Sequence, residues 1–343
     1  MPSPNRNSSE PSRYPPPAAL LLDYGIDAAP DYRPVDEGLL NRSFRVRAGQ
    51  ETYFLKQYLD QGSKTIRAQH AATRALARAG LPALPPLADR DGRTLLIRGG
   101  RHYALFPWVL GEHLPGPTLT TAQCTDLGAL LARMHEALCR ILGPVGQPLF
   151  QPADTAAQAE ATAMRLLRRL RSRARRDGID DLAEFRLEER ISLLRQLAGR
   201  RPPDDAVLTA GHVHGDFHGL NVLYSSAGAV RAVVDWDRLS VGPCLEELVR
   251  SALIIFVDPV DGTLELDRVR AYVRGYVSVR PRFAEELPLA VHRLWWERLT
   301  DFWMLIWRYE RDDPRPDRLF PSAAALVLWW THHYEKVLES FRG

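Results

Sequence analysis

Residues 212–237 have the sequence HVHGDFHGLNVLYSSAGAVRAVVDWD, and the rest of the chain can be placed around this stretch. Its first carboxylate, Asp216, is followed five residues later by the carboxamide of Asn221. Two short apolar runs come next, and a turn rich in Ser and Gly separates them. The second run ends at Asp235. The sequence therefore predicts a hairpin that presents Asp216, Asn221 and Asp235 at its two ends.

These three side chains are the set that phosphoryl transfer requires. One Asp accepts the proton of the attacking hydroxyl, while an Asn and a second Asp hold magnesium against the phosphates. We expect Asp216 to be the base, and Asn221 and Asp235 to be the Mg²⁺ ligands. A second interpretation is that His214, Asp216, His218 and Asp235 hold a hydrolytic metal, since HxDxH is a metal-like spacing. That interpretation gives Asn221 no role.

The motif HGDxxxxN, formed by residues 214–216 and Asn221, resembles the aminoglycoside phosphotransferase and choline kinase branch of the kinase-like fold. A loop with Gly242 and Pro243 follows, as in that family, although Glu247 stands where the family usually has Asp. The resemblance implies an α+β, bilobal, protein-kinase-like fold with a small antiparallel-sheet N-lobe and a mainly helical C-lobe. It also implies transfer of the γ-phosphate of ATP, or of GTP, to a hydroxyl of a small molecule.

The composition sets limits on other functions. The chain has 343 residues, a hydrophobic fraction of 45% and a formal net charge of +3, so nothing in it favours a nucleic-acid partner. The three cysteines lie far apart, and no apolar run approaches the roughly 20 residues of a membrane span. We expect a soluble cytoplasmic protein, monomeric or homodimeric, without a membrane partner.

The expected domain organisation follows the resemblance. Residues 1–17 are rich in Pro, Ser and Asn and are predicted to be a disordered tail. Residues 18–106 are the expected nucleotide-binding N-lobe, and 107–343 are the expected catalytic and acceptor-binding C-lobe. Residues 154–197 are predicted to be helical, with the run of Arg on a solvated face because Leu recurs at regular positions.

Five residues of the N-lobe and its end are the predicted nucleotide contacts. Lys56 is one of only three lysines and lies within a predicted strand, where it could contact the α- and β-phosphates or be a solvated edge residue. The resemblance implies a phosphate-covering loop at Gly38 and Asn41, and an adenine site at Phe106 and Trp108. On its own, the loop sequence would be an ordinary hairpin.

One departure from the family concerns the helix predicted at residues 63–79. The family places a Glu there to pair with the strand Lys, but this segment contains no Asp or Glu. Gln69 or His70 occupies the expected region, so either a neutral partner holds Lys56, or its partner comes from elsewhere, or the nucleotide site is weak. This departure keeps a nucleotide-binding pseudokinase open as an alternative, beside a protein Ser/Thr kinase.

The acceptor is predicted to be a hydroxyl-bearing antibiotic of aminoglycoside or nucleoside type, with a homoserine or choline type of metabolic kinase as the alternative. Acidic side chains and Trp residues of the C-terminal half motivate this prediction, because they could bind amines and stack on rings. The Trp residues recur at helical spacing, which equally predicts core packing. The predicted acceptor contacts are Glu246, Glu247, Glu297 and Asp301.

Overall fold

The computed structural model describes residues 19–35, 41–146 and 152–342. The predicted tail at 1–17 and the predicted loop residue Gly38 lie outside the described residues. The chain divides into two compact units, one made of Met1–Arg74 and Leu84–Val109, the other of Ala75–Ala83 and Leu110–Gly343. The division after residue 109 lies three residues beyond the boundary proposed from the sequence.

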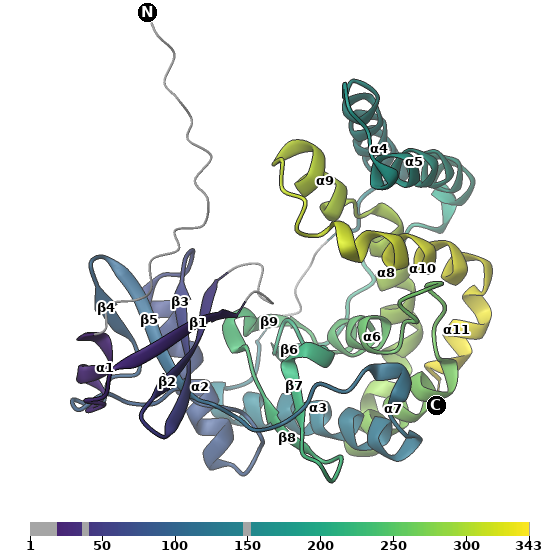
Figure 1. The fold of residues 1–343 in the computed structure, drawn as a ribbon. Helices are drawn as coiled ribbons and strands as arrows, with labels where there is room; N and C mark the ends of the chain where they lie inside the picture. The colour runs from purple at the N-terminus through teal and green to yellow at the C-terminus, as the bar shows by residue number, and fades with distance from the viewer. Residues whose placement is uncertain (1–18, 36–40, 147–151, 343) are drawn as a thin grey trace, which may run out of the picture. The chain divides into compact units, whose positions relative to one another are not determined.

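The first unit is built on one antiparallel sheet of five strands, in the order β1-β2-β3-β5-β4 (Figure 1). The alternating apolar residues of its strands fill the core, and Val46, Leu55 and Leu105 are fully buried. Its helices and strands are α1 (Ala19–Asp23), β1 (Pro30–Val35), β2 (Arg42–Ala48), β3 (Glu51–Tyr58), α2 (Ser63–Arg78, which ends in the second unit), β4 (Leu96–Arg98) and β5 (Arg101–Pro107).

The second unit is mainly helical. Its α-helices are α3 (Thr121–Leu142), α4 (Ala156–Arg171), α5 (Gly178–Leu197), α6 (Cys244–Ile255), α7 (Leu266–Val279), α8 (Leu287–Thr300), α9 (Trp303–Glu310), α10 (Phe320–His332) and α11 (Tyr334–Ser340). Its strands are β6 (Ala210–Val213), β7 (Val222–Tyr224), β8 (Val230–Val233) and β9 (Ser240–Pro243). No helix of the described residues is long and apolar enough to cross a membrane.

Helices α3 and α7 form the closest helix pair of this unit because a glycine lies on each contact face. A Cβ atom at Gly128 of α3 would lie 1.9 Å from the carbonyl oxygen of Tyr272, and one at Gly275 of α7 would lie 1.9 Å from the carbonyl oxygen of Thr125. Any side chain would force the two backbones apart. This pair supports His135 and Tyr276, which lie behind the catalytic loop described below.

The predicted helical segment at 154–197 is two helices, α4 and α5, that lie side by side (Figure 1). The break occurs because Asp177 caps α5, where its carboxylate accepts hydrogen bonds from the amides of Ile179 and Asp180. Most of the Arg residues of this pair form ion pairs, as those of Arg171 with Glu184 and Glu188 show. The solvated charged face predicted from the sequence is therefore correct.

The Trp-rich C-terminal segment is partly core and partly surface. Trp295, Trp296 and Trp330 are fully buried, whereas Trp303 and Trp307 are partly exposed. Two short strands of this unit, β6 and β9, were not predicted, and they pair in antiparallel register from Ala210–Pro243 to Val213–Ser240. The pairing joins segments about 30 residues apart, so no local sequence pattern predicts it.

Candidate active site

The predicted catalytic loop lies between β6 and β7. Its turn depends on Gly215, which has a φ of 83°. A Cβ atom at this position would also lie 2.2 Å from the carbonyl oxygen of Arg238. Only glycine satisfies both conditions, and it sets the direction in which the neighbouring Asp216 leaves the backbone.

His214 braces this loop with both of its ring nitrogens. Its Nε2 donates to the carbonyl of Val234 at 3.0 Å, and its Nδ1 accepts the backbone N–H of Asp216 at 3.2 Å. The ring is fully buried and packs against the ring of Trp236, with 4.6 Å between the two ring centroids. Burial lowers the pKa of His214, which keeps the ring neutral. Neither nitrogen is therefore available to a metal, which removes His214 from the ligand set of the metallohydrolase interpretation.

Glu247 of α6 holds the same loop from the other side. Its buried carboxylate accepts the backbone N–H of His214 at 3.0 Å and that of Gly215, and it pairs with Nε2 of His135 at 2.8 Å. Nδ1 of His135 is hydrogen-bonded to the hydroxyl of Tyr276 at 2.9 Å. Glu247 therefore makes the loop contact of the family's Asp, and its prediction as an acceptor contact is corrected.

Charge is retained on both partners of this buried pair. Burial acts to raise the pKa of Glu247, but the hydrogen bond to His135, the charge of His135 and the loop amide outweigh it, so the pKa lies below its usual value. Burial likewise acts to lower the pKa of His135, yet Tyr276, Cys244 and Glu247, in that order, hold this pKa well above the usual value. A charged pair thus fixes the backbone on which Asp216 stands.

Asp216 is the carboxylate that the loop presents. Its Oδ2 lies 3.5 Å from Nε2 of His218, and its Oδ1 lies 3.5 Å from Nη2 of Arg250 on α6. Burial acts to raise the pKa of Asp216, but His218 and the charges of Arg250 and Arg238 outweigh it, so the pKa is lowered. The carboxylate is therefore ionised at neutral pH, which is the form that a general base requires.

The predicted metal ligands are placed by short-range constraints. Nδ2 of Asn221 donates to the carbonyl of Asp216 at 2.8 Å, which leaves its carboxamide oxygen as the atom that can serve as a ligand. The backbone carbonyl of Asn221 accepts the N–H of Val234 at 2.9 Å and so ties the loop to the end of β8. Asp235 follows with a left-handed backbone, φ 60° and ψ 63°, which is rare outside glycine and frequent at functional sites.

This donor set fits Mg²⁺. Magnesium prefers oxygen ligands and is commonly held by one or two carboxylates together with substrate phosphates and water. Asn221 and Asp235, if they bind the ion as predicted, would supply one amide and one carboxylate oxygen. The described ranges contain no group of three or more His, Cys, Asp or Glu residues that could hold a metal by itself. The site suits a cation that arrives with a nucleotide, whereas a structural zinc site would use a closed protein shell.

In the first unit, Lys56 and Phe106 lie close together. Lys56 pairs with Ala104 across β3 and β5, is buried, and has its Nζ 6.0 Å from the ring centroid of Phe106. His70 of α2 uses Nε2 with the hydroxyl of Tyr58 at 3.0 Å and Nδ1 with the hydroxyl of Thr94 at 2.9 Å. A hydrogen bond from Lys56 to the His70 ring is therefore not available.

The charge of Lys56 nevertheless affects the pKa of His70. Burial, together with the nearby cations Lys56 and Arg74, lowers the pKa of His70 to about 4. The ring is thus neutral at physiological pH. His70 and Gln69 are the two α2 residues in the region where the resembled family carries an acid, and neither is charged here.

The other predicted nucleotide contacts lie at the ends of strands. The carboxamide oxygen of Asn41 accepts the N–H of Leu59 at 3.4 Å, so Asn41 fixes the exit of β3. The ring of Trp108 lies under the guanidinium of Arg45, 4.8 Å from the ring centroid, and its backbone N–H donates to Thr52 at 3.3 Å. A backbone contact of Trp108 to adenine would therefore use its carbonyl.

Comparison with known proteins agrees with this geometry. A family model described as the phosphotransferase enzyme family matches residues 31–282. The chain belongs to the phosphotransferase enzyme family. The match spans the Lys56 strand, the catalytic loop and Asp235, and the chain is a small-molecule kinase.

Two curated relatives of this phosphotransferase are named homoserine kinase. The one from Methylobacillus flagellatus is 26% identical and the match covers 82% of this chain and 83% of the relative. The one from Phenylobacterium zucineum is 27% identical, over 83% of this chain and 84% of the relative.

Two solved structures share the fold. A microcompartment-associated aminopropanol kinase has a TM-score of 0.59 at 20% identity, with 94% of this chain and 98% of that chain covered. An aminoglycoside phosphotransferase from Alicyclobacillus acidocaldarius has a TM-score of 0.62 at 15% identity, with 96% and 97% covered. The predicted kinase-like α+β fold is confirmed.

The other three predicted acceptor contacts of this phosphotransferase are Glu246, Glu297 and Asp301. Glu246 pairs with Arg293 at 2.8 Å. Burial raises its pKa against the effect of that arginine. Glu297 lies 3.7 Å from Arg298, and Asp301 accepts the N–H of Trp303 at 2.9 Å.

Sequence reasoning missed Arg250 and the role of His135. Arg250 lies 34 residues after Asp216, and its Nη1 also approaches the carbonyl of Gly215 at 3.4 Å. The available signal was spacing, since Arg250 lies three residues after Glu247 and therefore on a neighbouring position of the same helix face. His135 is a buried residue of α3. Its pairing with Glu247 could not be foreseen.

Proposed function

We propose that this protein transfers the γ-phosphate of ATP to the hydroxyl of a small hydroxy amino acid of the homoserine class, with Mg²⁺ as cofactor. The relatives that share about four fifths of the chain are named homoserine kinase, which supports this class over the antibiotic acceptor expected from the sequence. One observation of the structure supports an acceptor that has a carboxylate: the cation of Arg250 lies beside Asp216, the proposed base.

Arg250 is suited to bind a carboxylate of the acceptor. Its Nη2 is 3.5 Å from Oδ1 of Asp216, at the limit of a hydrogen bond, and its side chain is about one third exposed. A guanidinium binds a carboxylate through charged hydrogen bonds, and only the exposed part of Arg250 is open to a ligand. An amino acid whose hydroxyl reaches Asp216 would bring its carboxylate close to this guanidinium.

The proposed reaction proceeds as a direct transfer. The acceptor hydroxyl gives its proton to the carboxylate of Asp216 as its oxygen forms a bond to the γ-phosphorus. The bond from that phosphorus to the β–γ bridging oxygen breaks, and ADP leaves with that oxygen and its electron pair. The proton on Asp216 then passes to solvent. His214 and Glu247 fix the loop, so that Asp216 needs little reorganisation during the transfer.

The residues proposed to bind the nucleotide and its metal ion are those predicted from the sequence. Lys56 is the proposed contact to the phosphates, and Phe106 and Trp108 are the proposed contacts to the base, with Gly38 and Asn41 at the phosphate-covering loop. Asn221 and Asp235 would hold Mg²⁺, which neutralises the phosphate charge when it is bound.

An assay of ADP release with a panel of acceptors tests the proposal. We expect L-homoserine to be turned over, and 3-aminopropan-1-ol, which lacks only the carboxylate, to have a kcat/KM at least about tenfold lower. Faster turnover of kanamycin or a nucleoside antibiotic than of L-homoserine would refute the homoserine class. Absence of metal-dependent ADP release with every acceptor would favour the pseudokinase.

The variant Arg250→Met tests the residue that carries the choice. Loss of a charged hydrogen-bonding pair costs about 1.5–3 kcal/mol, so kcat/KM for L-homoserine should fall about 10- to 100-fold. The value for 3-aminopropan-1-ol should change little. Arg274→Met, an exposed residue of α7, is the matched control. Equal losses with both acceptors would mean that Arg250 acts on Asp216 and does not bind the acceptor.

A further inference from the structure

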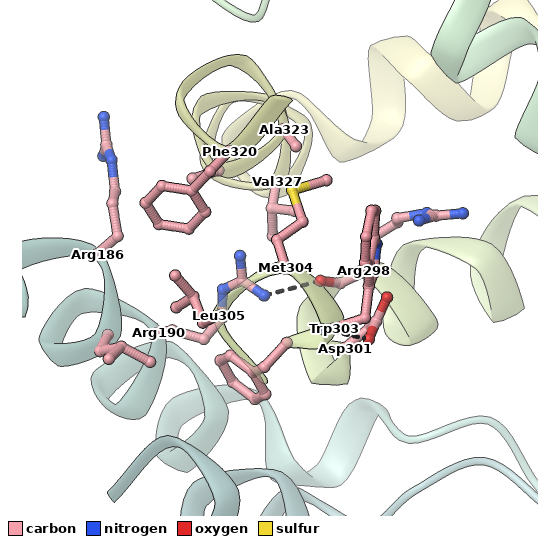
Figure 2. Close-up of a pocket in the computed structure, with 13 residues that line it drawn as sticks. Arg186, Arg190, Arg298, Asp301, Trp303, Met304, Leu305, Phe320, Ala323 and Val327 are labelled. Atoms are coloured by element: carbon pink, nitrogen blue, oxygen red, sulfur yellow. Dashed lines mark hydrogen bonds between the residues drawn. The ribbon is translucent and has the colours of Figure 1, made fainter. Parts of the chain in front are cut away.

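A cavity of about 60 Å³ lies in the second unit among α5, the segment that joins α8 to α9, and α10 (Figure 2). Most of its lining is aliphatic or aromatic, with Leu305, Phe320, Ala324 and Val327 among the lining residues. Asp216, Asn221, Asp235 and Arg250 do not line it. None of the residues assigned to the phosphoryl-transfer step therefore lines the cavity.

The guanidinium of Arg190 lies in the middle of this lining (Figure 2). Arg190 is more than nine-tenths buried, and its Nη1 donates to the carbonyls of Arg298 at 2.7 Å and Leu299 at 3.0 Å. Across the described ranges, its Nε and Nη2 donate to no group, and no carboxylate lies within 4.0 Å of it. These two donors form the edge of a guanidinium that binds a carboxylate through two parallel hydrogen bonds.

The charge of Arg190 is therefore only partly compensated. Burial lowers its pKa to about 10, against the more distant carboxylate of Asp301. A buried cation without an ion pair is costly, and an anion that binds there would offset the cost. The geometry thus favours a ligand that brings its own carboxylate.

The second charged group of the cavity is Asp301. Its Oδ1 accepts the N–H of Trp303 at 2.9 Å, which leaves its other oxygen able to accept a hydrogen bond. The two remaining charged lining residues lie beside acids of their own helices. Arg186 is 2.7 Å from the carboxylate of Glu189, and Arg298 is 3.7 Å from that of Glu297. The cation of Arg190 and the anion of Asp301 therefore remain without an ion-pair partner in the cavity. A zwitterionic ligand would supply an opposite charge to each of them.

We propose that this cavity binds an α-amino acid with a small aliphatic side chain. The carboxylate of the ligand would bind the Nε and Nη2 edge of Arg190, and its ammonium group would bind Asp301. The side chain would pack on Leu305 and Val327. A cavity needs about 10–15 Å³ of such space to hold one water molecule, so about 60 Å³ leaves room for a side chain of a few carbon atoms.

The aliphatic lining separates this ligand from the proposed acceptor. The hydroxyl of homoserine would be buried against apolar side chains without a hydrogen-bond partner, which costs about 1–3 kcal/mol. L-Valine makes the same charged contacts without that loss. An amino acid bound here would therefore be distinct from the one that is phosphorylated, and its binding does not depend on the proposed acceptor.

Isothermal titration calorimetry on the full-length protein without nucleotide tests the site. We expect L-valine to bind at least about tenfold more tightly than L-homoserine, D-valine, isobutylamine or 3-methylbutanoate, which each lose one feature of the match. Asp301→Asn keeps an acceptor for the N–H of Trp303 but should weaken L-valine at least about tenfold. Asp312→Asn, which removes a charge outside the cavity lining, should leave binding unchanged.

Ala324→Leu fills the cavity without changing a charge, so it should abolish binding of L-valine even where Arg190 substitutions disturb folding. Arg190→Lys keeps the charge but loses the two-donor edge and should weaken binding. Failure of L-valine to bind, or equal binding in Ala324→Leu, would overturn the proposal. Tighter binding of L-homoserine, lost in Asp301→Asn together with a raised KM for it, would assign the cavity to the acceptor and also overturn it.

Discussion

The buried carboxylate of Glu247 gives the sharpest test of how the catalytic loop is held. In Glu247→Gln the side chain keeps its length, but one of its two terminal oxygens becomes an NH₂ group. The carboxylate accepts hydrogen bonds from the amides of His214 and Gly215 and pairs with His135 at 2.8 Å. The amide cannot accept both backbone hydrogen bonds and also pair with a charged imidazole.

The magnitude follows from those contacts. One buried backbone N–H loses its acceptor, which costs about 1–3 kcal/mol, and the charged hydrogen bond to His135 becomes a neutral one, which costs about 1 kcal/mol more. The sum is about 2–4 kcal/mol, close to the range for breaking a buried pair. At about 2–4 °C per kcal/mol for a domain of this size, the Tm of the second unit should fall by about 4–16 °C.

Thermal unfolding followed by Trp fluorescence measures this shift, because the buried Trp295, Trp296 and Trp330 lie in the same unit. Turnover should fall as well, since Asp216 follows directly after the released backbone. Glu188→Gln, which removes a half-exposed partner of Arg171, is the control and should change Tm by less than about 2 °C. A Glu247→Gln protein with the Tm and kcat of the natural chain would refute the bracing role.

The pH dependence of the same variant has a defined sign. The lowered pKa of Glu247 means that its stabilisation is present above its unfolded pKa of about 4.3 and is lost as pH falls through the folded value. The raised pKa of His135 means that its stabilisation is present below about 6.5 and is lost only as pH rises through the folded value. The Tm difference between the two proteins should thus be largest between about pH 4.3 and about pH 6.5 and should shrink as pH falls below about 4.3.

Three further predictions concern catalysis, metal and packing. Asp216→Asn should keep the fold but lower kcat about 10²-fold or more, and near-normal turnover would remove it as the base. Asp235→Ala should raise the Mg²⁺ concentration needed for half-maximal rate, whereas Asp237→Ala should have a smaller effect; the reverse order would show that the wrong Asp was assigned. Gly275→Ala places a Cβ 1.9 Å from a carbonyl of α3 and should destabilise the protein by about 1–3 kcal/mol or more in denaturant, whereas Gly199→Ala, which meets nothing within 4 Å, should not.

The sequence alone determined the elements whose signal is local. The hairpin at residues 222–233 follows from alternation and a Gly-containing turn, and β2, β3 and α2 follow from the same periodicities. Asp216, Asn221 and Asp235 likewise lie within one short stretch of the sequence, so their spacing is visible without the fold. The family match bears out the phosphotransferase chemistry that this spacing predicts.

Only the tertiary structure decided which distant side chains support that stretch. Glu247 looked like one of several acids that could bind an amine, but packing of α6 turns it inward to the loop amides and His135. Arg190 and Asp301 are 111 residues apart and line one cavity only because α5 packs near the end of α8. A sequence records which groups carry charge and at what spacing. Which charges are removed from water, and which face each other, depends on burial of helix faces that comes from the whole fold.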